Sequence, residues 1–140
     1  MFEKTNLSNA QLLGASFRGV KFIDSKIIGN NFSECTNLSD INFERCLLDY
    51  CIFQELKIPA STFKECNLKE VDFSGSTLTS SMFEGSRLTS ANFNGSNLTK
   101  CDFTNSVEYL IDPMFTKIKK AKFSMPEAMS LLTSFDIEIS

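Results

Sequence analysis

A strict five-residue period between Phe63 and Phe103 constrains the fold more than any other feature of the sequence. Phenylalanine and leucine alternate at every fifth position: Phe63, Leu68, Phe73, Leu78, Phe83, Leu88, Phe93, Leu98 and Phe103. A small residue usually lies two positions before each of these central residues, and Asn or Asp often lies one position before. The pattern predicts a repeat architecture, in which each unit buries its central residue against its neighbours.

Neither regular secondary structure accommodates this period. Five steps along an α-helix rotate the chain by about 500°, which scatters the large residues around the cylinder. An odd spacing on a flat strand places successive large residues on opposite faces. The chain must therefore turn once per repeat, so that each pentapeptide forms one short side of a coil. The alternation of Phe and Leu requires an even number of sides, and four sides leave room for the core.

The register of the coils follows from one irregular spacing. Between Phe32 and Leu38 the step is six residues, which predicts a one-residue insertion near residues 35–36, bulging at a corner. With this insertion, the central residues from Phe2 to Phe103 fall into four columns, two of which are almost entirely phenylalanine. Successive coils should rise by about 4.8 Å, as paired strands do.

The repeat units resemble a known family. Val71–Gly75, Ala91–Gly95 and Ser96–Lys100 each contain a small residue, then Asp or Asn, then Phe or Leu, then two mostly polar residues. In this the sequence is similar to the pentapeptide-repeat family, over roughly residues 2 to 106. The resemblance implies an all-β solenoid, namely a right-handed quadrilateral parallel β-helix.

The chain divides into two predicted parts. Residues 1–106 form the β-helix of about five coils, and residues 107–140 form a C-terminal cap of loop, helix and strand. Ser124 as N-cap, Pro126 in the first turn and Glu127 predict a short α-helix to about residue 134. The alternating residues 135–139 predict a final strand. The fold class is therefore a β-solenoid with a short C-terminal α-helical cap, which repeat arrays need.

Two ends of the rod are candidates for contacts with another chain. Relatives of this family commonly dimerise through the C-terminal cap, so the resemblance implies a homodimer contact at Met129, Leu132 and Phe135. The sequence predicts no N-terminal cap on the first coil at Phe2, so we expect its open edge to be either covered by a partner chain or frayed.

A local departure from the repeat marks a second candidate surface. Leu47 and Ile52 occupy outward positions that usually hold Asn or Asp, Tyr50 follows at a corner, and Ile28 points outward one coil earlier. Neighbouring long side chains could cover these residues locally. Alternatively, they form an exposed apolar patch that binds a protein partner.

Composition excludes several function classes. The chain has no histidine, which removes His-based catalysis and most zinc sites, and we expect no catalytic, cofactor-binding or metal-binding residues. Five cysteines without C-x-x-C spacing predict structural thiols in a reducing compartment. A net charge of −3 and the lack of a basic stripe argue against direct nucleic-acid binding. No secretory or membrane-length apolar segment is present, so a cytoplasmic location is expected.

The sequence thus predicts a non-enzymatic, bacterial-type rod that binds a macromolecule whose identity no motif reveals. The alternative is a DNA-mimicking regulator of DNA gyrase or topoisomerase IV, as in the quinolone-resistance members of the family. Because B-DNA carries one charge per about 1.7 Å, a five-coil mimic should carry on the order of 14 net negative charges. Residues 1–106 hold 12 Asp and Glu against 10 Lys and Arg, which disfavours mimicry unless the charges gather on one side.

Overall fold

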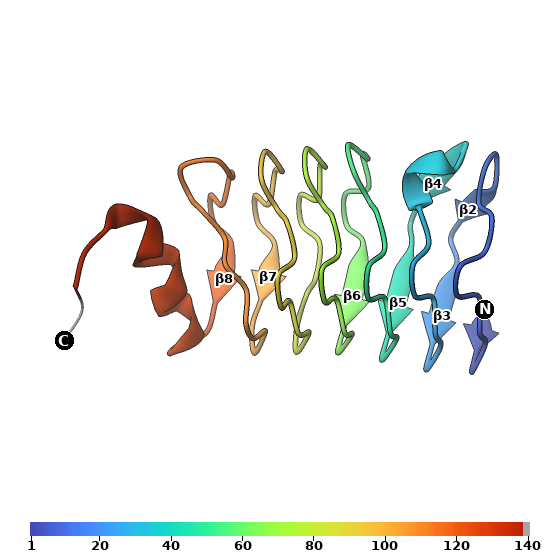
Figure 1. Ribbon diagram of the computed structural model, residues 1–140, viewed down its shortest axis with the longest axis horizontal. Helices are drawn as coiled ribbons and strands as arrows, with labels where there is room; N and C mark the ends of the chain where they lie inside the picture. Colours follow the sequence, from blue (N-terminus) through green and yellow to red (C-terminus); the bar gives the residue numbers. More distant parts are fainter. Residues whose placement is uncertain (139–140) are drawn as a thin grey trace.

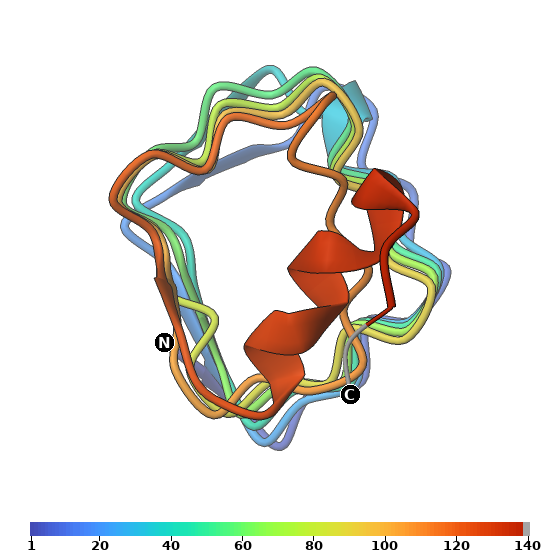
Figure 2. The ribbon, with the colours of Figure 1, turned by 90° about the vertical axis from the view of Figure 1, so that its left-hand side faces the viewer.

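The computed structural model describes residues 1–138 as a stack of coils with a short helix across one end (Figure 1). Viewed along the stack, successive coils superimpose on a roughly four-sided outline (Figure 2). The first coil and the helix lie at opposite ends of the stack (Figure 1). Neighbouring coils pair in parallel. The predicted parallel β-helix with a short helical cap is confirmed, and it has about six turns.

Each side of a coil offers only five residues, so its strands are short. β1 (Phe2–Glu3), β3 (Lys21–Ile23), β5 (Asn42–Glu44) and β6 (Thr62–Lys64) form a four-stranded sheet, β2 (Ser16–Arg18) pairs with β4 (Asn37–Ser39), and β7 (Asp102–Phe103) pairs with β8 (Lys122–Phe123). Elsewhere single parallel bridges continue the ladder, as between Asp72 and Asn92. A full ladder is therefore built from one to three residues per side.

The register confirms the predicted insertion. Phe2 pairs with Phe22, Phe22 with Phe43, and Phe43 with Phe63, in steps of 20, 21 and 20 residues. Asn6 and Lys26 pair at a step of 20 residues, whereas Ser16 and Asn37 pair at a step of 21, so the extra residue lies between Lys26 and Asn37. In this segment Cys35 directly follows the 3-10 helix η1 (Phe32–Glu34), whose N-cap residue Asn31 accepts a hydrogen bond from the Ser33 N–H at 3.0 Å. The insertion thus lies near the corner at Cys35, as predicted.

The corners depend on left-handed backbone geometry. Every fifth residue has a positive φ along most of the coils, and most of these residues carry side chains, such as Tyr50 (φ 64°), Glu65 (φ 52°) and Ser80 (φ 59°). Gly29 (φ 76°) has no such freedom of substitution, because a Cβ there would lie 2.3 Å from the Asn9 side-chain oxygen. The turn predicted once per repeat is therefore made by one left-handed residue per side.

The core contains two columns of stacked phenylalanine rings, and the ring planes of one column are perpendicular to those of the other. The Phe63 and Phe83 ring centroids are 5.1 Å apart with planes 7° from parallel, and Phe73 stacks on Phe93 at 5.1 Å and 6°. Across the coil, Phe73 and Phe83 meet edge to face at 5.6 Å and 89°. Both geometries are favourable for aromatic pairs. The two predicted phenylalanine columns are thus confirmed, and aliphatic residues such as Leu88 fill the other two.

The small inward residues satisfy the backbone of the coil. The Ser86 hydroxyl donates to the Phe63 carbonyl and accepts from the Cys66 N–H at 2.9 Å. On the outside, the Asn92 side chain accepts from the Asn94 N–H at 3.0 Å, a local Asx turn. Because buried polar groups need partners, the inward position two residues before each centre favours serine or cysteine over a purely apolar residue.

The coil does not end near residue 106. Val107 pairs with Arg87, and β8 stacks on β7 so that the Phe123 and Phe103 rings lie 5.1 Å apart, 2° from parallel. Tyr109 is 2% exposed and replaces the expected central residue, because the chain turns at Glu108 (φ 63°). The periodic pattern is lost in this sixth coil, but its ladder positions are kept, which is why the sequence alone indicated a loop.

The cap also differs in detail from the prediction. The helix η2 (Glu127–Phe135) is a 3-10 helix without a side-chain N-cap, and the Ser124 hydroxyl instead accepts from the Asn105 N–H at 3.0 Å. The expected strand is absent from residues 135–138, where Asp136 is left-handed (φ 50°), and Ile139 lies outside the described residues. The strand prediction was therefore wrong for 135–138, because no coil edge is paired with this segment.

Candidate interaction surfaces

Leu47 and Ile52 both face outward, as predicted, one position before a central residue. Leu47 is 37% exposed, and Ile52 is half-buried. They lie on adjacent sides of one coil and in separate ladders. Their ladder neighbours are all polar or charged: Lys26 and Asn67 for Leu47, and Asn31 and Asp72 for Ile52. Neither residue therefore extends into an apolar stripe along the rod.

Tyr50 occupies the corner between these two sides. Its side chain is 49% exposed, and the Lys69 ammonium lies 5.9 Å from the ring centroid, within cation–π range. Ile28 is half-buried on the side that also holds Leu47, one coil earlier, and its N–H donates to the Ser8 hydroxyl at 3.2 Å. The candidate patch of Ile28, Leu47, Tyr50 and Ile52 thus wraps around one corner.

The cap places two of its three predicted contact residues together. Met129 and Leu132 line a shallow surface cavity of about 340 Å³. Phe135 is not among the lining residues and is 49% exposed. Leu131 packs against the core, yet no residue of η2 is buried. The helix therefore crosses the end of the coil stack while leaving apolar side chains accessible.

The sixth coil adds exposed apolar residues that the sequence analysis did not single out. Leu110, Met114 and Phe115 are 70%, 67% and 69% exposed. Their ladder positions are outward ones, which the predicted loop at the start of the cap does not reveal. Aligning these residues with the preceding coil at a step of 20 residues would have identified them.

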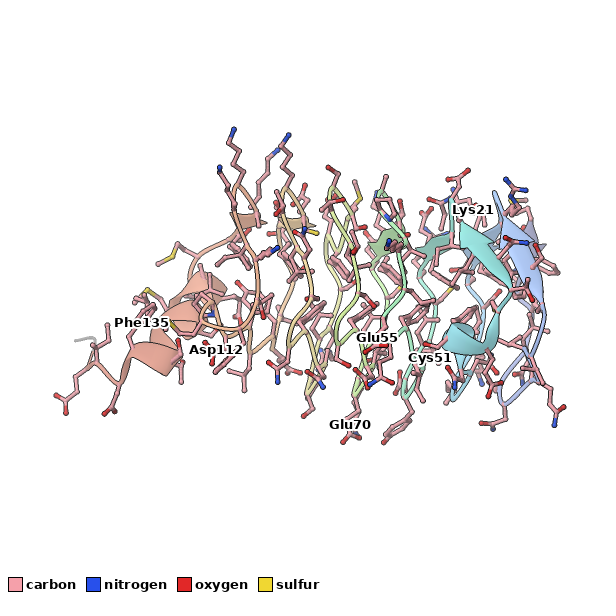
Figure 3. The ribbon with its side chains drawn as sticks, turned by 90° about the horizontal axis from the view of Figure 1, so that it is seen from above. Lys21, Cys51, Glu55, Glu70, Asp112 and Phe135 are labelled. Atoms are coloured by element: carbon pink, nitrogen blue, oxygen red, sulfur yellow. The ribbon has the colours of Figure 1, made fainter. Side chains whose placement is uncertain are left out.

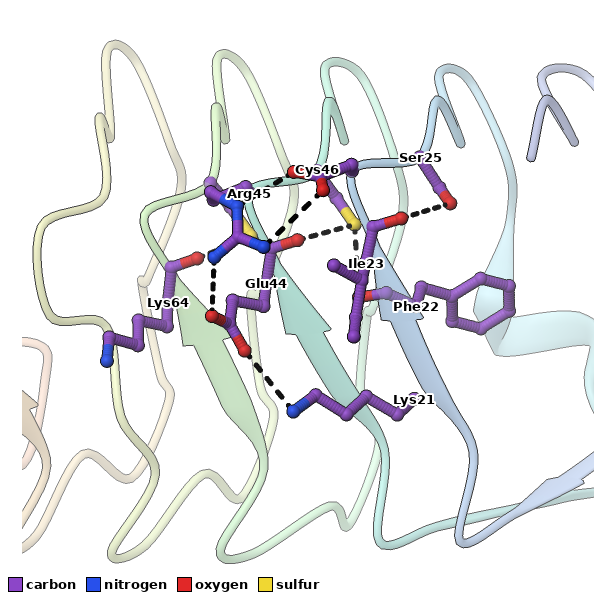
Figure 4. Close-up of polar contacts among 10 residues, drawn as sticks. Lys21, Phe22, Ile23, Ser25, Glu44, Arg45, Cys46 and Lys64 are labelled. Carbon is purple, nitrogen blue, oxygen red and sulfur yellow. Dashed lines mark hydrogen bonds and ion pairs between the residues drawn. The ribbon is translucent and has the colours of Figure 1, made fainter. Parts of the chain in front are cut away.

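An ion-pair network lies on the outer face of β3 and β5 (Figure 4). Lys21 Nζ lies 3.3 Å from Glu44 Oε2, and Arg45 bridges Glu44 Oε1 at 2.6 Å and Asp24 Oδ1 at 2.8 Å. The hydrogen bond from Arg45 lowers the pKa of Asp24, and the hydrogen bond from Lys21 lowers the pKa of Glu44. These charges neutralise one another across neighbouring coils, so they align the coils rather than attract a ligand.

Comparison with known proteins identifies the repeat. A family model of pentapeptide repeats matches residues 2–36, and a model of the pentapeptide repeat region matches residues 36–107, which is more than half of the chain. The chain belongs to the pentapeptide-repeat family.

Solved structures of pentapeptide-repeat proteins share the fold. A trypsin-treated variant of QnrB1, described as a plasmid-mediated fluoroquinolone resistance protein, is 20% identical with a TM-score of 0.58, and the match covers 99% of this chain and 91% of that one. Rfr23 from the cyanobacterium Cyanothece is 14% identical with a TM-score of 0.44, over 89% of this chain and 80% of that one. No curated protein matches the chain. The similarity to the QnrB1 variant shows that the two proteins share the fold.

The cysteines of this pentapeptide-repeat protein occupy structural positions. Four are buried, and Cys35 is partly exposed. The Cys51 and Cys101 thiols donate to the Ile27 and Leu78 carbonyls at 2.9 Å, and burial raises the pKa of both thiols to about 12. Cys46 differs, because a hydrogen bond from Cys66 lowers its pKa to about 7. Burial therefore raises the pKa of the Cys51 and Cys101 thiols, whereas a hydrogen bond lowers the pKa of the Cys46 thiol.

Residues 1–138 contain neither a cluster of metal ligands nor a membrane-spanning helix. No group of three or more potential metal ligands occurs among these residues. None of their helices has both the length and the apolar character needed to cross a membrane.

Proposed function

We propose that this pentapeptide-repeat protein is a non-enzymatic rod that binds another macromolecule in the cytoplasm and is joined into a homodimer through its C-terminal cap. One observation carries the dimer: exposed large apolar side chains gather in the last coil and the cap. They include Leu110, Met125, Phe135 and Ile137. Exposed apolar patches on a protein surface typically mark interaction sites.

The geometry of η2 suits a two-fold contact. In such a contact the same patch is presented by both subunits, so a single helix crossing the end of the rod can pack against its own copy. Met129 and Leu132 line the cavity on this helix, and a flexible methionine adapts to an irregular apolar partner. Two rods would then meet end to end, with the partner-binding sides of both left free.

The test is the oligomeric state of the full-length protein. We expect the wild type to sediment as a dimer and the variant with Leu132→Glu and Phe135→Ser to sediment as a monomer. A dimer of the variant would bury one new carboxylate from each subunit in the contact. Leu13→Glu is the matched control, since Leu13 is 82% exposed but belongs to the first coil. A monomeric wild type, or a variant that remains dimeric, would place any self-association elsewhere.

The charge arrangement does not favour the DNA-mimic alternative. The most acidic side of the rod carries four carboxylates and no basic residue: Glu34, Glu55, Asp72 and Asp112. A duplex of similar length presents on the order of 14 negative charges, so this side carries far too few. We therefore expect no effect of the protein on supercoiling by DNA gyrase, and a dose-dependent inhibition would reverse this ranking.

A further inference from the structure

The last two coils concentrate positive charge on one side, and across the corner that this side shares with β8, in an otherwise acidic protein. Five lysines form what we call the lysine face: Lys100, Lys117, Lys119, Lys120 and Lys122. The Lys100 N–H donates to the Lys119 carbonyl at 2.9 Å, and Lys117 and Lys122 lie beside Asn97 and Asp102 of the preceding coil. Figure 3 shows several side chains ending in nitrogen that project together from these coils. The ladder therefore gathers charges that lie up to 22 residues apart in the sequence.

None of these lysines is neutralised within the described part of the chain. The ion pairs found in residues 1–138 use Lys21, Arg45 and Arg87 instead. Even Asp102, the ladder neighbour of Lys122, forms no ion pair with it. Charges on coils about 4.8 Å apart lie well within the Debye length of about 10 Å at 0.1 M salt, so they repel one another. An anionic partner would relieve this repulsion.

A groove with an exposed aromatic ring adjoins the lysine face. It has a volume of about 510 Å³, and its walls include Thr77, Asn97, Phe115 and Lys117. The Phe115 ring is 69% exposed, and two residues further along the chain Lys117 begins the lysine face. The groove thus combines an apolar ring, polar side chains and one end of the cationic surface.

We propose that the lysine face and this groove bind a single-stranded nucleic acid, with its phosphates on the lysines and a base stacked on Phe115. Single strands are bound in this way, by a positive surface that follows the backbone and by aromatic rings on which bases stack. The net charge of the chain argues against such binding, but a net charge does not show that five lysines lie close together at one end of the rod. A flat anionic membrane fits less well, because the groove lies at a corner of the rod and is lined by residues of both sides that meet there.

Fluorescence anisotropy with the full-length protein and labelled oligothymidylate of about 16 nucleotides tests the proposal. If five phosphates are neutralised, affinity should fall about 100-fold when salt rises fourfold, from about 50 to 200 mM. For the triple variant Lys117→Gln, Lys119→Gln and Lys120→Gln, the same rise should weaken binding only about sevenfold, from an already lower affinity. Phe115→Ser should weaken binding about tenfold without changing the salt dependence.

A matched variant controls for net charge. Lys4→Gln, Lys26→Gln and Lys64→Gln also remove three positive charges, but from earlier coils of the rod, and should leave affinity and salt dependence nearly unchanged. The proposal is overturned if the wild type fails to bind the oligonucleotide at low salt, or if the two triple variants lose affinity equally. Equal or tighter binding of a duplex of the same length would also overturn it. So would binding to vesicles of phosphatidylcholine and phosphatidylserine without binding to the oligonucleotide.

Discussion

Phe83 and Phe135 have the same side chain in two different parts of the molecule. Phe83 lies in the middle of the rod between Phe63 and Phe103, at centroid distances of 5.1 and 4.9 Å, and is completely buried. Phe135 ends the cap helix and is 49% exposed. In the middle of the rod, a coil on each side removes both faces of a ring from water. The end of the rod has a coil on one side only.

This difference in burial suggests that the middle of the rod provides stability and that its ends provide surfaces for interaction. Burial of apolar surface is the main favourable term in folding, so the middle coils should provide most of the stability. The same kinds of side chain at the end leave apolar surface that another molecule can cover. The first coil shows the same effect, since Phe2 stacks only on Phe22, at 4.9 Å, and is 37% exposed.

The largest effect should come from the middle of the rod. Phe83→Ala removes a ring stacked on both faces and should lower the free energy of unfolding by about 3–5 kcal/mol. Thr79→Ala, at an outward position of the preceding side, is the control and should change it by less than about 0.5 kcal/mol. Denaturant titration of both variants measures the difference. Equal midpoints would show that the middle rings are not the main source of stability.

A smaller loss is expected at the open end. Phe2→Ala removes a ring that is stacked on one face and partly hydrated, so it should cost about 1–2 kcal/mol. The same denaturant titration, compared directly with Phe83→Ala, checks the ratio. A loss as large as that of Phe83→Ala would mean that another chain covers the first coil.

Alkaline pH should weaken the middle of the rod selectively. The pKa of Cys51 and of Cys101 is raised by burial from about 9 to about 12, so above pH 9 the unfolded chain releases these protons while the folded chain keeps them. Stability is then lost as pH rises, by up to about 1.4 kcal/mol per pH unit for each thiol. Thermal unfolding of the wild type and of a Cys51→Ala, Cys101→Ala variant above pH 9 measures this. If the melting temperatures of the wild type and the variant fall equally with pH, the two thiols are not the cause of the loss.

The smallest effect on stability is expected at the patch of Ile28, Leu47, Tyr50 and Ile52, which stays a predicted partner site. Leu47→Asn with Ile52→Asp restores the residues usual in the repeat, so the unfolding midpoint should stay nearly unchanged. Binding of the partner in a pulldown, compared with the wild type, should be lost. If the double variant unfolds, local packing explains these residues and the middle of the rod has no such site.

Much of the fold could be predicted because the repeat is local. A large residue at every fifth position requires one turn per five residues, whatever the rest of the chain does. The six-residue step between Phe32 and Leu38 likewise determined the register, since only an insertion keeps Phe22 above Phe43. These features depend on geometry within one or two coils, which a sequence contains in full.

The tertiary structure decided what depends on a neighbouring coil. The Ser124 hydroxyl accepts from Asn105, 19 residues earlier, and this contact replaces the helix cap that its local sequence favours. Tyr109 enters the core without matching the repeat, and its ring centroid lies 6.0 Å from that of Phe103 and 5.6 Å from that of Phe123. The lysine face arises in the same way, since Lys100 and Lys119 become neighbours only when one coil stacks on the next. Net charge and periodicity can be read along the chain alone. Burial and the distribution of surface charge depend on which side of which coil a residue occupies.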